Sequence, residues 1–259
     1  DGAGRTALHA AIDQERVRAA EILRTIGDLD IFAAAGLGEE SRVAELLASD
    51  PKLARESQAD GTTALFYAIL AGNVSIASRL LDARSDASPR STRHWACIAP
   101  LHLAIMRKQM SLVDLLLSRG SDPDSHSSAR SYSPTPLHIA ARWGEHEYIV
   151  RLLEAGADLF AGGPVSQGTG HSVIGWVAFS GQVDTLRLLI DYGLDVRDTR
   201  CGAVIHLAAA KGHTVLVDLL LRYGVDPGGL DREGRTPLEC AIEQGQLETV
   251  ELLQKRRTL

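Results

Sequence analysis

Apolar residues along this chain fall into two alternating kinds of short segment. The first kind is rich in small residues, as in the Ala-Ala pairs at 140–141 and 208–209. The second kind carries adjacent leucines, which recur at 115–117, 152–153, 188–189, 219–221 and 252–253. Apolar groups at this spacing are typical of short amphipathic helices. The pattern therefore predicts pairs of helices, in which the small residues of the first helix allow close packing.

Glycines separate the two helices of each pair and end the second one. A glycine follows the first helix, for example at Gly144 and Gly212. Glycines also follow the leucine segments, where a C-terminal residue with positive φ is expected: Gly120, Gly156, Gly193 and Gly224. An aspartate comes two residues after each of these glycines: Asp122, Asp158, Asp195 and Asp226.

A short motif opens each pair of helices. Its fullest form is Thr-Pro-Leu-His-Ile-Ala-Ala at 135–141, and related copies start near 6, 29, 63, 99, 172, 203 and 236. Threonine is a good helix N-cap and proline suits the first helical position. Thr236 is followed three residues later by Glu239, which predicts a capping box.

This pattern closely resembles the ankyrin repeat, whose period is about 33 residues around a TPLHxA core. The resemblance extends over nearly the whole chain. It implies an all-α solenoid of stacked helix-turn-helix units with β-hairpin or loop fingers, because one repeat alone cannot bury its apolar face. We expect a single domain over residues 1–259, with repeats beginning near 1, 28, 58, 94, 130, 167, 198 and 231 and a polar C-terminal cap.

Charge and composition narrow the class of function. The net charge of −6 argues against nucleic acid as the main partner, because phosphate binding needs a concentrated positive surface. No apolar run approaches 18 residues, so membrane insertion is not expected. The three scattered cysteines favour a reducing, cytoplasmic (intracellular) location. Because residue 1 is Asp and a repeat begins at once, we interpret the chain as a fragment or a processed product.

The residues offer no convincing catalytic or metal site, so we expect neither enzymatic activity nor a cofactor. Four histidines occupy the fourth motif position, where we expect them to join hydrogen bonds between repeats: His9, His102, His138 and His206. The loop at 163–168 fails both the GxSxG and the phosphate-loop patterns. The sequon at 73–75 is interpreted as a coincidence, since nothing indicates secretion.

In the ankyrin pattern, partners are contacted by the finger tips and by the two residues before the glycine in the middle of each repeat. The resemblance therefore implies a partner-binding set, which is rich in the aromatic and arginine residues that dominate interface hot spots. Its members are Arg93, His94, Trp95, Arg107, Arg130, Tyr132, Arg142, Trp143, Phe179, Arg200 and Lys211. We expect a monomeric protein–protein interaction scaffold or adaptor that binds a partner protein through the concave groove and fingers, centred on repeats 4–6.

Two alternatives remain open from the sequence. In the first, the chain is a targeting or regulatory module of a larger enzyme or channel whose other domains are absent from this chain. In the second, a pocket between the long fingers binds a small molecule or acts as an enzyme, which would require a deep cavity with converging polar groups.

Overall fold

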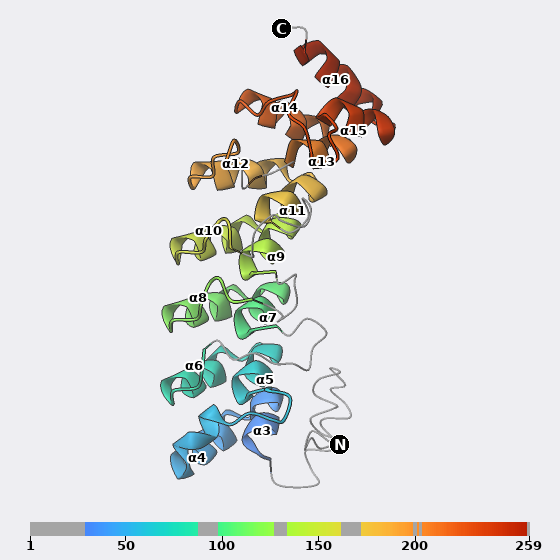
Figure 1. Ribbon diagram of the computed structural model, residues 1–259. Helices are drawn as coiled ribbons and strands as arrows, with labels where there is room; N and C mark the ends of the chain where they lie inside the picture. Colours follow the sequence, from blue (N-terminus) through green and yellow to red (C-terminus); the bar gives the residue numbers. More distant parts are fainter. Residues whose placement is uncertain are drawn as a thin grey trace. The chain divides into compact units, whose positions relative to one another are not determined.

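The computed structural model describes residues 29–87, 98–126, 134–161, 172–198, 201 and 204–257. These ranges contain fourteen α-helices and one 3-10 helix (Figure 1). The chain divides into two compact units, residues 1–136 and 137–259, which are described separately below. In the described ranges, every helix falls short of the length and apolar character that crossing a bilayer demands.

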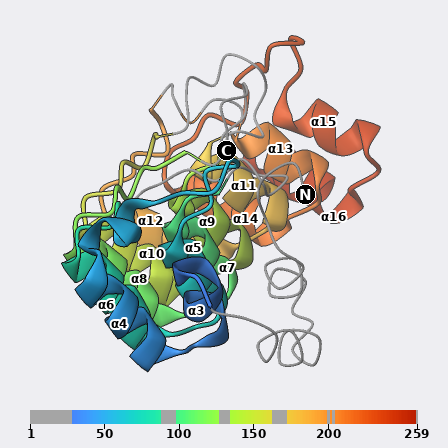
Figure 2. The same cartoon turned by 90° about the horizontal axis from the view of Figure 1, so that it is seen from below.

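The first unit consists of helix pairs arranged in two rows. Helices α3, α5 and α7 follow one another in one row, and α4, α6 and α8 form the other (Figure 2). The elements are α3 (Ile31–Leu37), α4 (Glu40–Ser49), η1 (Pro51–Arg55), α5 (Ala64–Leu70), α6 (Val74–Asp82), α7 (Pro100–Met106) and α8 (Met110–Ser118). The short helix η1 stands where other repeats carry a glycine turn.

The second unit repeats the same two-row arrangement. Helix α13 packs on α11 and α15, while α14 packs on α12 and α16. The elements are α9 (Pro136–Trp143), α10 (His146–Glu154), α11 (Val173–Ser180), α12 (Val183–Asp191), α13 (Val204–Ala210), α14 (Thr214–Arg222), α15 (Pro237–Glu243) and α16 (Leu247–Arg257). The predicted all-α repeat fold is confirmed.

The helix starts follow the predicted capping chemistry. The side chains of Thr63 and Ser172 each accept a hydrogen bond from the backbone N–H three residues later. Thr236 and Glu239 form the predicted capping box, in which each side chain satisfies the other's backbone N–H. These caps begin the first helix of three repeats at the predicted motif.

The core of the repeats is made of the small residues and leucines that the sequence singles out. Ala140, Ala141, Ala208 and Ala209 have no exposed surface, and Leu152 and Leu220 are equally buried. Alanine allows the backbones of neighbouring first helices to approach closely, whereas the leucines fill the wider space between the rows.

Left-handed backbone ends the helices where glycine was expected. Gly144, Gly181 and Gly245 share a φ of 69°, a conformation that glycine adopts without steric penalty. Two of the described positions carry another residue in this conformation. Lys108 takes the mid-repeat position at φ 56°, and Arg84 takes the position after the second helix at φ 65°. A residue with a Cβ pays roughly 1–2 kcal/mol for this conformation.

The motif histidines connect successive repeats, as predicted. His102 Nε2 lies 3.0 Å from the carbonyl oxygen of Pro134, and His206 Nε2 lies 2.9 Å from that of Gly229. Because a carbonyl only accepts, both imidazoles donate these bonds. His138 is also buried, and His9 lies outside the described residues. A donor at this position ties the first helix to the connection that leads into the next repeat.

The connections between repeats are turns in the part of the chain that the structure describes. The finger aspartates Asp122, Asp158, Asp195 and Asp226 each accept a hydrogen bond from the backbone N–H two residues later, which is a turn-stabilising role. Among the described residues there is no strand, only an isolated antiparallel bridge between Ser57 and Thr63. The expected β-hairpin arms are therefore not confirmed.

Candidate functional site

Five of the eleven expected partner-binding residues are described. Arg107 follows α7 in the first unit, and the other four lie at the ends of first helices in the second unit: Arg142, Trp143, Phe179 and Lys211. Arg93, His94, Trp95, Arg130, Tyr132 and Arg200 lie outside the described residues.

Two large aromatic side chains are exposed at corresponding ends of first helices. Trp143 is the last residue of α9 and is 43% exposed, and Phe179 lies in the last turn of α11 and is 50% exposed. Ala141 lies two residues before Trp143 and Ala178 directly before Phe179, and both alanines are fully buried. Once the alanine side of the helix faces inward, the bulky residues that follow it are left on the surface, just before the left-handed glycine.

Two cation–π contacts join successive first helices near these ends. Lys211 Nζ lies 4.6 Å from the centroid of the Phe179 ring, so α11 and α13 share a cation–π contact at their ends. The guanidinium carbon of Arg142 lies 4.5 Å from the centroid of Trp176, on the next first helix. Arg142 therefore packs on Trp176 and joins α9 to α11.

A hydrogen bond from the next repeat reaches the end of α11. His213, at the start of α14, donates from Nε2 to the carbonyl oxygen of Phe179 over 3.1 Å. A side chain at Gly181 would meet the His213 ring, which shows how closely the imidazole approaches this turn. The backbone beneath Phe179 is thus fixed from the next repeat. A surface that is already ordered loses less entropy when it binds.

The perturbed titratable groups of the second unit stabilise turns and helix contacts. Burial raises the pKa of Asp231, but hydrogen bonds from the backbone and guanidinium of Arg235 outweigh it and hold this pKa at about 2. A hydrogen bond from Arg256 lowers the pKa of Asp218 and joins α14 to α16. Burial raises the pKa of the Cys240 thiol to about 11, so this thiol stays protonated at neutral pH. These groups explain local structure and do not form a catalytic set.

A separate feature escaped the sequence analysis. An open pocket in the first unit is lined by η1 and by the residues that end α6. The one available signal was Arg84, because it occupies the position that holds Gly120, Gly156, Gly193 and Gly224 in later repeats.

A solved structure shares this fold across almost its full length. The chain aligns with the human ASB11 ankyrin repeat domain at a TM-score of 0.64 and 20% identity, covering 97% of this chain and 98% of that one. At this identity the likeness shows the fold alone.

Three curated proteins share part of the sequence. The Drosophila melanogaster E3 ubiquitin-protein ligase Ufd4 is 28% identical over 88 residues, which is 33% of this chain and 3% of that protein. A Caenorhabditis elegans homologue of transient receptor potential cation channel subfamily A member 1 is 32% identical over 79 residues, 29% of this chain and 6% of that protein. The human ARF GTPase-activating protein GIT1 is 45% identical over 49 residues, 19% of this chain and 6% of that protein. The chain thus spans only a small share of each.

A match to a protein-family model identifies the family of this chain. The model described as ankyrin repeats in three copies matches residues 31–127, 101–200 and 174–258. Ankyrin repeats are in general protein-interaction modules. With its helix pairs, glycine turns and inter-repeat histidines as observed, this chain belongs to the ankyrin repeat family.

Proposed function

We propose that this chain is a protein–protein interaction scaffold that binds a partner protein along the first-helix ends and adjoining fingers. The exposure of Trp143 and Phe179 carries the proposal. Both rings lie on the surface at the ends of successive first helices, and aromatic residues are enriched in interface hot spots. The binding region centres on repeats 4–6.

The charges around these rings favour a partner with mixed apolar and acidic character. Lys211 contacts the Phe179 ring and is itself exposed, so its ammonium remains available to a carboxylate at the edge of the interface. Arg142 is also exposed while its guanidinium packs on Trp176. An arginine held over a ring is already ordered, and it still offers N–H donors to a partner. Arg107 and the finger residues outside the described ranges belong to the same proposed set of partner-binding residues.

In a second candidate function, the array still binds a partner but is one domain of a larger protein. The curated proteins that match include a ubiquitin ligase and a channel homologue, and the chain covers only 3% and 6% of them. In this version the array is the targeting or regulatory module of an enzyme or channel. The reading frame around residues 1–259 decides between the two, because a catalytic or membrane segment in it would support the module.

Two further properties belong to the proposal. We expect the array to act as a monomer in a reducing intracellular compartment, in keeping with the buried, reduced thiols of Cys201 and Cys240. Sedimentation at micromolar concentration should give the mass of one chain. A concentration-dependent dimer would overturn the monomer assignment.

The test of binding uses a surface variant and a matched control. Trp143→Ser combined with Phe179→Ser removes both exposed rings, whereas Val215→Ser removes an apolar side chain that is 67% exposed on α14. Circular dichroism and thermal melting first establish that all three proteins are equally folded. We expect a specific protein to be captured from native cell lysate by wild type and the control but lost with the double variant. Equal capture by all three would contradict the proposed surface.

A further inference from the structure

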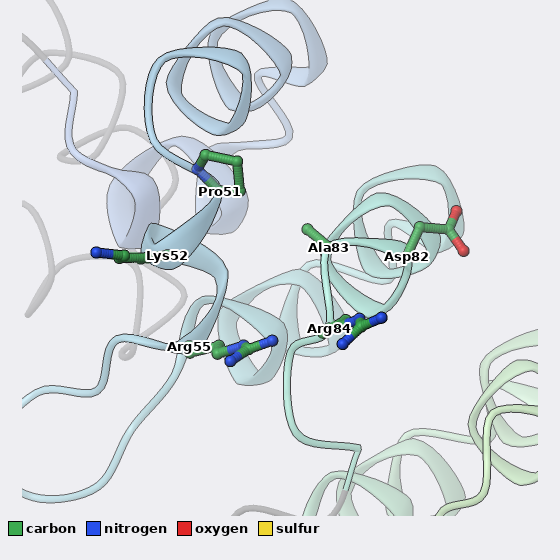
Figure 3. Close-up of a pocket in the computed structure, with 6 residues that line it drawn as sticks. All are labelled: Pro51, Lys52, Arg55, Asp82, Ala83 and Arg84. Atoms are coloured by element: carbon green, nitrogen blue, oxygen red, sulfur yellow. The ribbon is translucent and has the colours of Figure 1, made fainter.

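The first unit contains an open pocket that is separate from the exposed aromatics. It has a volume of about 390 Å³ and lies between η1 and the end of α6. Figure 3 shows Arg55 reaching from η1 toward the end of α6, where Arg84 lies, while Lys52 points to the other side of η1. Pro51 and Ala83 supply apolar surface at the same place.

The charge of this pocket is positive and uncompensated. Its single carboxylate, Asp82, points away from Arg55 in Figure 3 and forms an ion pair with Arg119 at 2.8 Å. Within the described part of the chain, the side chains of Lys52, Arg55 and Arg84 form no hydrogen bond or ion pair, and all three are exposed. The two guanidinium groups are thus available to a ligand.

The backbone supplies an independent observation. Arg84 has a φ of 65°, at a position where the following repeats use glycine. The backbone at Arg84 is therefore strained in a way that glycine at this position would avoid. Backbone outliers of this kind concentrate at functional sites. The 3-10 helix that carries Arg55 follows α4, in the repeat before that of Arg84.

We propose that this pocket binds a phosphorylated serine or threonine side chain of a protein partner. Two guanidinium groups match the charge of a phosphate monoester near −2 and its three acceptor oxygens, since arginine pairs with phosphate through parallel N–H donors. A single carboxylate carries one negative charge and would compensate the charge of only one of the two arginines. Pro51 and Ala83 would lie against the peptide that carries the phosphate, a contact that a free ion lacks. The site does not depend on the Trp143 and Phe179 surface.

The experiment titrates the whole ¹⁵N-labelled chain with a heptapeptide of glycine and serine that carries one central phosphoserine. Parallel titrations use the same peptide with serine, the same peptide with glutamate, and inorganic phosphate. Amide shifts at Lys52, Arg55 and Arg84 report binding at the pocket. We expect the phosphoserine peptide to bind at least about tenfold more tightly than each of the other three, and binding to weaken as salt rises.

Variants decide whether the arginines are responsible. Arg55→Gln and Arg84→Gly should each weaken binding by about tenfold, while Arg187→Gln, an equal charge change at an exposed position in the second unit, should leave it unchanged. Arg84→Gly should also raise the melting temperature, because it relieves the left-handed strain, so loss of binding cannot be ascribed to unfolding.

Four results would overturn the proposal. Equal binding of the glutamate peptide would show a general acidic-peptide surface. Equal binding of inorganic phosphate would show a free-anion site. Shifts absent from the pocket, or unchanged affinity in both arginine variants, would remove the site altogether.

Discussion

The mid-repeat glycines allow a sharp test of how repeats constrain one another. Gly181 and Gly245 occupy the same position in their repeats and share a φ of 69°. A Cβ added at Gly245 would meet no described atom within 4 Å, whereas at Gly181 it would sit 2.7 Å from Nδ1 and 2.8 Å from Cε1 of His213. Alanine at the two positions therefore suffers the same backbone strain but a different contact.

The magnitudes follow from these two terms. Alanine in the left-handed conformation destabilises the folded state by about 1–2 kcal/mol. Replacing glycine by alanine also reduces the entropy of the unfolded chain, which offsets about 0.4–1 kcal/mol of this loss. Gly245→Ala should therefore lower the free energy of unfolding by about 1 kcal/mol. Gly181→Ala must also displace the His213 ring and break its 3.1 Å bond to the Phe179 carbonyl. That loss adds about 1 kcal/mol, for about 2 kcal/mol in total.

Urea unfolding followed by circular dichroism measures both variants. The matched control is the double-mutant cycle with His213→Ala, because removing the ring should reduce the cost of Gly181→Ala to that of Gly245→Ala. The reasoning is refuted if the two glycine variants lose equal stability, or if the cost of Gly181→Ala is the same with and without His213.

Three further outcomes can be measured on the same material. The pKa of Asp231 is lowered to about 2, so the stabilising effect of its carboxylate is complete above the ordinary pKa of 3.8 and fades as the pH falls toward 2. In urea melts at pH 7, Asp231→Asn should lower the free energy of unfolding by roughly 1–2 kcal/mol, a value already reduced for the solvent exposure of Arg235. At pH 2 the same substitution should change the free energy of unfolding little. Burial raises the pKa of Cys240 to about 11, so iodoacetamide at pH 8 should modify Cys240 only after unfolding, as peptide mass spectrometry would show. Lys108→Gly should raise the free energy of unfolding by about 0.5–1 kcal/mol in urea melts, since it removes left-handed strain at φ 56°; an unchanged or lower value would show that the lysine side chain compensates for the strain.

The fold could be predicted because each repeat carries its own local signals. A threonine cap, a buried alanine pair, a left-handed glycine and a leucine helix act within about 30 residues, so no long-range information is needed to place them. Thr236 with Glu239, and His206 with the Gly229 carbonyl, behave as their positions indicate. The helix η1 was missed because Pro51 and its neighbours lack the usual glycine turn. The absence of that glycine does not indicate which structure takes the place of the turn.

The candidate site was less predictable because it depends on side-chain rotamers. The sequence places Arg142 beside Trp143, yet its guanidinium packs on Trp176, 34 residues away. The contact of Lys211 with Phe179 likewise joins two repeats. The exposure of side chains at the end of a first helix follows from the buried alanines. The aromatic ring that each cation contacts depends instead on how the repeats pack against one another.

Site-specific photo-crosslinking tests the central proposal most directly. A benzophenone amino acid replaces Phe179 in one protein and Val215 in another, two residues that are 50% and 67% exposed on α11 and α14. After irradiation in native lysate, the account predicts one discrete protein adduct from position 179, absent from position 215 and suppressed by excess unlabelled wild-type chain. The same adducts from both positions, or an adduct from position 215 alone, would contradict binding along the first-helix ends.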